Sequence, residues 1–323
     1  MYGGIELKIS VSLFLFMIMW TINAFAGAGG NIGVKDGREY GELSNPIYSS
    51  VARLDSNGYV KGTAGFIAEN IVITNRHVAE TCIRNKCSVY FWDGTQYQTS
   101  DVEILAMPKE HKKDNGTDWA ILKTSIPNKN FKQLAPFTTK GPVYRGGFGV
   151  MRLIPDEEIP IIKQALVEAR DAKCEPGEGT VSCVNRVANK LLTEKYNLKP
   201  LFNDVKNFKI QQCSIHTIMN TGMVRTNCDS SSGDSGAPLL RGNQTVGLNN
   251  YGLHGIFDEE EWRGAYAVNT NNFYNIFQII MAKENPGWPS VDTIKILQDD
   301  NIITDPQEIQ RQAEQSLLNY QCN

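Results

Sequence analysis

Short apolar segments separated by turn signals fill most of the chain, and this pattern constrains the fold more than any other feature. Turn signals stand at Asp55-Ser-Asn-Gly58 and at Glu69-Asn70, and the second joins two apolar segments as a predicted hairpin. The candidate strands are residues 47–54, 63–68, 71–74, 88–92, 102–107 and 119–122, and the pattern resumes over 208–269. Short strands at this spacing favour a β-sandwich or β-barrel over alternating α/β units.

Two stretches depart from the strand pattern. Residues 156–207 are charged and contain helix-like runs at 161–169 and 187–196, which predicts an insertion on the surface. Residues 271–282 are predicted to form a helix that ends before Pro286-Gly-Trp-Pro289, and we expect a polar helical tail from there to the C-terminus. The expected apolar face of this helix consists of Phe273, Ile276, Phe277 and Ile280.

The first 26 residues have the layout of a secretory signal peptide. Lys8 precedes an apolar run over 11–20, and Ala24-Phe-Ala26 forms a small-residue site for cleavage after Ala26. An uncleaved membrane anchor is the alternative, although the run is short for a bilayer core about 30 Å thick. We therefore expect a secreted or periplasmic protein without stable membrane association after cleavage. Residues 27–46 form an N-terminal arm, whose Gly-rich part 27–41 is expected to be loose or a remnant pro-segment.

The cysteines fit export to an oxidising compartment. Six of the seven have a near neighbour, and pairing by proximity joins Cys82 with Cys87, Cys174 with Cys183 and Cys213 with Cys228. Six cysteines allow many other pairings, and free thiols are a further alternative. Cys322 is left over. The absence of any Cys-x-x-Cys pair argues against a zinc site.

Three short segments carry residues that suit nucleophilic catalysis. An apolar strand runs into a polar turn that presents His77, Asp118 directly precedes another apolar strand, and a Gly-flanked turn, Gly233-Asp-Ser235-Gly, presents a serine. A serine hydroxyl is a poor nucleophile at neutral pH, so it needs an adjacent base, and a histidine base needs a carboxylate to orient it. Each segment alone is a weak signal, but together they occur in the order His, Asp, Ser on an all-β background.

These three segments resemble the signatures of the chymotrypsin family, closer to its bacterial-type branches than to the animal digestive enzymes. The resemblance covers roughly residues 47–277. It implies an all-β fold of two antiparallel six-stranded β-barrels with a partly helical insertion and C-terminal helices. We expect the first barrel over 47–130, the second over 131–270 with the insertion 156–207, and a C-terminal helix and tail over 271–323.

The resemblance also implies the chemistry, a secreted serine endopeptidase that acts through an acyl-enzyme. Ser235 would attack the peptide carbonyl, His77 would transfer the proton, and Asp118 would orient His77. The backbone N–H groups of Gly233 and Ser235 would form the oxyanion hole. No cofactor and no metal are expected, and the partners would be protein or peptide substrates of a monomeric enzyme.

Asp234 needs a partner, because a buried carboxylate without one is costly. Animal relatives pair it with a newly cut N-terminus, usually of an Ile-Val-Gly-Gly sequence, which does not occur in this chain. Some bacterial relatives use an internal arginine, which by counting back from Gly147-Phe-Gly149 corresponds to Arg145. Arg38 and the N-terminus are the other candidates.

The primary specificity would be set by Asp229, six residues before Ser235, where trypsin-like members carry the charged floor of the pocket. An anionic floor favours cleavage after Arg or Lys. The remaining pocket residues implied by the family are Asn250, Tyr251 and Gly252 on one wall and Gly264 on the far side. Glutamyl specificity is weakened because Asn249 stands where those relatives have a histidine, but the nearby His254 keeps it open. Specificity for small residues is the other alternative.

Other classes of function find less support. One alternative is a catalytically silent binding protein on the same fold, which usually lacks a triad residue, whereas all three are present here. Another is an enzyme held latent by the N-terminal arm or the C-terminal tail. A net charge of −3 gives no support for nucleic-acid binding. His111 and His216 lie outside any partner motif and are expected to be surface or core residues.

Overall fold

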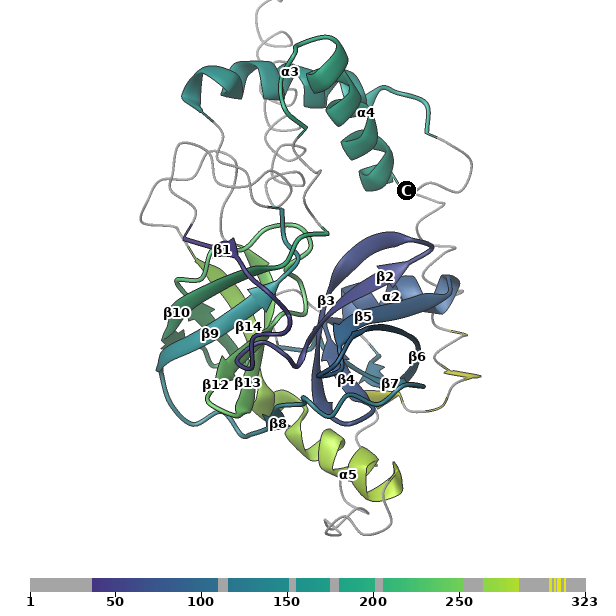
Figure 1. Ribbon diagram of the computed structural model, residues 1–323, viewed down its shortest axis with the longest axis vertical. Coiled ribbons are helices and arrows are strands. Elements are labelled where there is room, and N and C mark those ends of the chain that lie inside the picture. Colours follow the sequence, from purple (N-terminus) through teal and green to yellow (C-terminus); the bar gives the residue numbers. More distant parts are fainter. Residues whose placement is uncertain are drawn as a thin grey trace, which may run out of the picture.

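The computed structural model describes residues 37–109, 116–150, 155–174, 180–200, 206–252 and 264–284, together with residues 302, 303, 305, 307, 308 and 311. The chain forms two closed antiparallel six-stranded β-barrels that lie side by side (Figure 1), which confirms the predicted fold class. The predicted signal peptide, residues 1–26, lies outside the described residues.

The first barrel follows from the alternation of apolar residues recognised in the sequence. Its strands are β2 (Val51–Ser56), β3 (Tyr59–Ala68), β4 (Ile71–Thr74), β5 (Cys87–Trp92), β6 (Tyr97–Pro108) and β7 (Ala120–Thr124). They pair in the order β5-β2-β3-β4-β7-β6, and β6 closes the barrel on β5. In β5 every second residue is buried, as expected for a strand with one face on a core. The predicted hairpin at Glu69-Asn70 is present as the pair β3–β4.

The second barrel contains β9 (Gly141–Gly147), β10 (Lys209–Ile218), β11 (Met223–Thr226), β12 (Pro238–Arg241), β13 (Gln244–Gly252) and β14 (Ala265–Asn269). They pair in the order β10-β11-β14-β13-β12-β9, and β9 closes on β10. Two short strands are added outside this ring. These are β8 (Gln133–Leu134), parallel to β13, and β1 (Glu39–Tyr40), antiparallel to β10.

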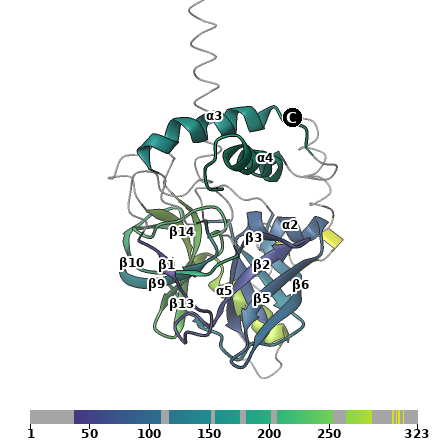
Figure 2. The same cartoon turned by 45° about the horizontal axis from the view of Figure 1, so that its top comes forward.

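The helices lie outside the barrels. The insertion contains α3 (Ile159–Arg170), preceded by the 3-10 helix η1 (Asp156–Glu158), and α4 (Thr180–Glu194). The Cys174–Cys183 disulfide links the segment after α3 to α4. This pair lies beyond one end of the barrels, where both views show it (Figures 1 and 2). It has its own small apolar core, which includes Ile162, Ala165 and Leu192.

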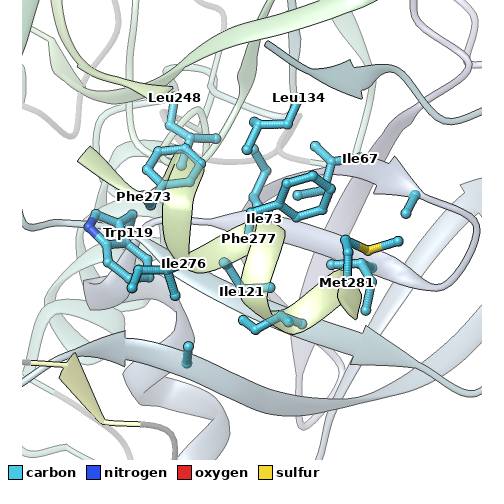
Figure 3. Packing of buried hydrophobic residues seen from close by; sticks show 14 of the residues in the cluster. Ile67, Ile73, Trp119, Ile121, Leu134, Leu248, Phe273, Ile276, Phe277 and Met281 are labelled. Carbon is cyan, nitrogen blue, oxygen red and sulfur yellow. The ribbon is translucent and has the colours of Figure 1, made fainter. Parts of the chain in front are cut away.

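The helix that follows β14 ties the two barrels together. The 3-10 helix η3 (Thr270–Asn272) leads from β14 into α5 (Tyr274–Glu284). The apolar face predicted for this helix is buried, and it packs into a cluster that draws on both barrels (Figure 3). Ile67 and Trp119 enter from the first barrel, Leu248 enters from the second, and the rings of Trp119 and Phe273 lie 5.5 Å apart. The relative position of the barrels therefore depends on this shared core.

The three predicted disulfides are present, at Cys82–Cys87, Cys174–Cys183 and Cys213–Cys228. Cys322 lies outside the described residues. Proximity was a sound guide because each bond joins neighbours along the chain, with sequence separations of 5, 9 and 15.

Three local expectations are wrong. The described part of the arm is not loose, because β1 pairs with β10 and Arg38 is buried. The C-terminal tail is not helical throughout, because β15 (Ile302–Ile303) pairs with β6. His77 stands in the first turn of the helix α2 (Arg76–Arg84) rather than in an open turn. In the first two cases distant backbone groups supplied a pairing that local sequence does not reveal.

We expect Phe277→Ala to lower the free energy of unfolding by about 3–5 kcal/mol, because it opens a cavity in the core shared by the barrels. Phe277 is 3% exposed. Urea unfolding measures the change. Val167→Ala on α3 is the control, since Val167 is 54% exposed and its truncation should shift the unfolding free energy by less than about 0.5 kcal/mol. Equal effects of the two substitutions would contradict the importance assigned to this core.

Candidate active site

The end of β4 and the start of α2 set the position of His77. Asn75 is the N-cap of α2 in an extended conformation, and its carbonyl accepts the first helical hydrogen bond, from the N–H of Ala79 at 3.0 Å. Its side-chain amide donates instead to the backbone carbonyl of Asp118, at 2.8 Å. The strand β7 and the helix α2 are thereby joined where the two candidate catalytic residues stand.

His77 and Asp118 form a two-point contact. The backbone N–H of His77 donates to Oδ1 of Asp118 at 2.9 Å, and the ring Nδ1 lies 2.6 Å from Oδ2. The Asp118 side chain is 2% exposed, whereas the His77 side chain is 38% exposed. A buried carboxylate in this position favours the tautomer with a proton on Nδ1, and this leaves Nε2 as the basic atom of the ring.

The turn that carries Ser235 depends on glycine. Gly233 and Gly236 have φ values of +100° and +84°, a region that residues with side chains avoid. A Cβ on Gly236 would lie 2.2 Å from the carbonyl oxygen of Thr63 and 3.1 Å from the N–H nitrogen of Asn75. The turn is therefore packed directly against the segment that leads into His77.

Further contacts bring Ser235 to the first barrel. Its carbonyl accepts a hydrogen bond from the N–H of Thr63 at 2.8 Å, and the Thr63 hydroxyl donates to the carbonyl of Gly233 at 2.8 Å. A Cβ on Gly62 would contact both the Ser235 carbonyl oxygen and the side chain of Val78, the residue after His77. The turn that carries Ser235 thus meets the segments on either side of His77 across the two barrels, and the sequence did not identify Thr63 or Asn75 as supports of this contact.

The Ser235 hydroxyl donates to the carbonyl of Asn250 at 3.0 Å. Asn250 lies where the register of β13 and β14 shifts, between Asn249 and Tyr251. Within the described part of the chain, the N–H groups of Gly233 and Ser235 donate no hydrogen bond to another protein group. Two unused donors beside a serine hydroxyl are the groups that an oxyanion would need.

Asp234 is fully buried between two arginines. Arg38 Nη1 donates to its Oδ2 at 2.7 Å, and Arg145 Nη1 lies 3.1 Å from the same oxygen. The Arg145 contact is an ion pair without hydrogen-bond alignment, and among the described residues Nε and Nη1 of Arg145 have no hydrogen-bond partner. The expected partner Arg145 is therefore present, but the alternative candidate Arg38 makes the better directed contact.

Burial by itself raises the pKa of Asp234, but the opposing charges prevail. The guanidinium groups of Arg145 and Arg38 and the backbone N–H groups of Ser231 and Gly149 all favour the charged carboxylate, so its pKa is lowered below the ordinary value. Asp234 is thus an anion at neutral pH, with fixed donors around it.

Asp229 is buried at the base of the same region. Its Oδ2 accepts a hydrogen bond from the N–H of Gly37 at 2.6 Å and from Nε2 of Gln211 at 3.1 Å. Its own N–H donates to Oε1 of Gln211 at 2.8 Å. The carboxylate that the sequence assigns to the pocket floor therefore faces the N-terminal arm and β10 in this structure.

Two of the remaining predicted pocket residues, Gly252 and Gly264, contact the chain just after and just before Asp229. A Cβ on Gly252 would stand 2.6 Å from the carbonyl oxygen of Ser230, so the expected wall contacts the segment after Asp229 instead of leaving a gap beside it. Gly264 directly precedes β14, and a Cβ there would meet the carbonyl oxygen of Thr226. Tyr251 packs on Tyr266, with ring centroids 5.0 Å apart.

The other histidines add no site to the described structure. His216 is exposed on β10, and His111 and His254 lie outside the described residues. Among the described residues, no group of His, Cys, Asp and Glu side chains is arranged to hold a metal ion. In the same part of the chain, no helix has the length and apolar character needed to cross a bilayer.

Known proteins share both the sequence pattern and the fold. A family model described as a trypsin-like peptidase domain matches residues 62–248. Curated protein sequences give no significant match. Among solved structures, the chain is similar to neuropsin, a serine protease expressed in the limbic system of mouse brain, with a TM-score of 0.50 and 13% identity over 77% of this chain and 99% of that one. Because the family model covers more than half of its length, the chain belongs to the family of trypsin-like peptidase domains and is a serine-type endopeptidase.

Proposed function

We propose that the protein hydrolyses peptide bonds through an acyl-enzyme, with His77, Asp118 and Ser235 as its catalytic triad. The observation that carries this proposal is the buried Asp118 carboxylate, which holds the exposed ring of His77 by two contacts beside the Ser235 turn. A purely structural histidine would not need to keep its ring exposed while its Nδ1 is fixed.

The proposed reaction begins when the Ser235 hydroxyl leaves the Asn250 carbonyl, which a rotation about its Cα–Cβ bond achieves. Oγ attacks the carbonyl carbon of the substrate while Nε2 of His77 takes the hydroxyl proton. The carbonyl oxygen becomes an oxyanion, for which the N–H groups of Gly233 and Ser235 are the proposed donors. His77 then gives the proton to the leaving amine, and water cleaves the acyl-enzyme by the same steps in reverse order.

For specificity, we propose cleavage after Arg or Lys, with Asp229 as the attracting charge. The support for this proposal is the six-residue offset of Asp229 from Ser235 and the burial of Asp229. A substrate guanidinium could join the carboxylate that Gly37 and Gln211 already contact, since a carboxylate accepts several hydrogen bonds. The contact between Gly252 and Ser230 must open for such a long side chain to enter.

The contact between Gly252 and Ser230 also favours a second candidate specificity. If Gly252 and Ser230 stay together, only a small side chain fits beside Ser235, and the enzyme would cleave after small residues. Glutamyl specificity has weaker support, because Asn249 is committed to Ser230 and to the backbone of Asp234, and His254 lies outside the described residues.

We further propose that the enzyme is secreted or periplasmic, acts on protein or peptide substrates and works as a monomer. The signal-like first 26 residues and the three disulfides support export. Kinship with the bacterial-type branch is supported by an internal arginine beside Asp234.

Ser235→Ala should abolish peptide hydrolysis without unfolding the protein, because it removes the attacking atom and leaves the backbone turn intact. Turnover of a mixed peptide library should fall by roughly 10⁶-fold, by comparison with triad knockouts in this chemistry. The variant should also stop reacting with a fluorophosphonate probe, while circular dichroism stays unchanged. Cleavage at the parent rate would show that the triad is assigned to the wrong serine.

Asp229→Asn tests the pocket charge while keeping the shape of the side chain. The amide oxygen of Asn can still accept hydrogen bonds from Gly37 and Gln211, but the attraction for a cation is lost. We expect cleavage after Arg and Lys to fall by about 100-fold or more, because a buried charge discriminates strongly between paired and unpaired states. Labelling of Ser235 by a small fluorophosphonate should persist. A parent cleavage profile dominated by small residues would select the second candidate instead.

A further inference from the structure

A cavity outside the proposed active site opens beside α5. Its volume is about 690 Å³, which lies within the range of roughly 300–1,000 Å³ that small-molecule sites occupy. The described residues that line it belong to the β3–β4 hairpin, the end of β7 and the segment that follows, β8 and α5. In Figure 1, α5 and β8 lie at the lower end of the barrels, and the helical insertion lies at the other end. None of these lining residues belongs to the proposed triad or to the predicted specificity pocket.

The helix α5 presents one face to the cavity, which we call the α5 stripe (Tyr274, Phe277, Gln278 and Met281). These residues stand at positions i, i+3, i+4 and i+7, which lie along one side of a helix. Phe277 and Met281 are buried, whereas Tyr274 and Gln278 are half-buried. Ile67 of β3 lies beside Phe277 in Figure 3. The cavity therefore has an apolar floor, and the polar side chains of the stripe lie nearer to solvent.

Hydrogen bonds fix the walls that the first barrel contributes. The carbonyl of Asn70, in the turn between β3 and β4, accepts from the N–H of Thr124 at 2.9 Å. The carbonyl of Glu69 accepts from the N–H of Asn128 at 2.6 Å, and the Asn128 side chain is itself buried. The segment after β7 is thereby joined to both residues of the turn. The fold alone sets the shape of these walls, and a preformed shape is usual for sites that bind small molecules.

Glu69 is the charged side chain of the described lining, and it is exposed at the tip of the β3–β4 hairpin. Within the described part of the chain its carboxylate takes part in no hydrogen bond and no ion pair. Lysines of two adjoining segments are committed elsewhere, since Lys123 pairs with Glu284 and Lys132 donates to Asn243. The described lining therefore carries one negative charge and no positive charge.

Aromatic and sulfur-containing side chains line the same cavity. Phe131 and Tyr274, both half-buried, supply aromatic rings, and Met281 supplies a thioether. An aromatic face attracts an organic cation as well as apolar groups, and the unbranched Met side chain adapts to the shape of what it contacts. Rings together with a carboxylate are complementary to an alkyl- or arylammonium group, whereas an anion would meet no positive charge in the described lining.

We propose that this cavity binds a small hydrophobic ammonium ion, with its apolar part on the α5 stripe and its charge at Glu69. Burial of the apolar part supplies most of the affinity, because an exposed ion pair contributes little. The charge selects among ligands that the apolar surface alone would accept equally. This inference goes beyond the proposed function and does not depend on it, because the cavity shares no described residue with the triad.

Two probes with the same phenylbutyl group test the site, namely 4-phenylbutylamine, a cation at neutral pH, and the neutral 4-phenylbutanol. Isothermal titration calorimetry of the full chain should show that the amine binds about 3- to 5-fold more tightly than the alcohol, the upper range for an exposed charge pair. Glu69→Gln should weaken binding of the amine by about 3- to 5-fold and leave that of the alcohol within about 1.5-fold. Phe131→Leu should weaken binding of both probes by about 2- to 10-fold, because it removes an aromatic contact.

Glu194→Gln is the matched control. Glu194 is exposed on α4 of the insertion, so this substitution makes the same change in net charge at the other end of the molecule. The affinities for both probes should equal those of the parent. Asp229→Asn is the second control, because an amine could also enter the predicted specificity pocket, and the preference for the amine should persist in this variant.

The outcomes separate this site from the proposed function. The site is wrong if neither probe binds measurably, if both bind equally, or if the preference for the amine survives Glu69→Gln. A preference that is lost in Asp229→Asn and kept in Glu69→Gln would place the amine in the specificity pocket and would also overturn the inference. Binding is measured without turnover, so a chain that fails to hydrolyse peptides but loses its amine preference in Glu69→Gln would keep this site and lack the proposed activity.

Discussion

The buried carboxylate of Asp234 is the constraint on which the arrangement of the site depends. A charge removed from water costs several kcal/mol unless donors and an opposite charge replace its hydration. Here these come from parts of the chain that are remote in sequence, namely Arg38 in the arm, Arg145 in β9 and the N–H of Gly149. All of these donors must converge on one carboxylate. The closure of the second barrel, the position of the N-terminal arm and the shape of the turn that carries Ser235 therefore depend on one another.

Much of the fold could be predicted because its determinants are local. The hairpin at Glu69-Asn70, the apolar face that contains Phe277, and disulfides such as Cys82–Cys87 all follow from residues close together in sequence. The strand β1 could not be found in this way. Two residues carry too little periodicity to signal a strand, and β1 exists because β10 presents unpaired backbone groups to it.

At the site, too, the sequence indicates which residues are candidates, whereas the orientation of their side chains depends on distant segments. Motif spacing singled out Asp118 and His77 as candidate catalytic residues, and in the structure a strand end and a helix start fix where these side chains point. Spacing also singled out Asp229 as the candidate pocket charge, but it does not give the direction of the carboxylate, which depends on Gly37 and Gln211. Those partners come from other elements, and one sequence carries no record of which elements meet.

The division of the site between two barrels has a physical consequence for catalysis. His77 and Asp118 belong to the first barrel and Ser235 to the second, so the geometry that the proposed proton transfer requires is set by rigid-body packing as much as by local structure. The close contact of Gly236 with Thr63 and Asn75 allows no gap between the barrels at this point. The packing of α5 and of Phe273, which directly precedes it, into the core shared by both barrels also fixes their relative position, with Phe273 against Trp119. Proton transfer tolerates errors of only a few tenths of an ångström in heavy-atom distance, since the useful range is about 2.6–3.2 Å. A large core shared by both barrels supplies that rigidity because close-packed interiors resist small displacements, whereas hydrogen bonds at the interface alone would be open to exchange with water.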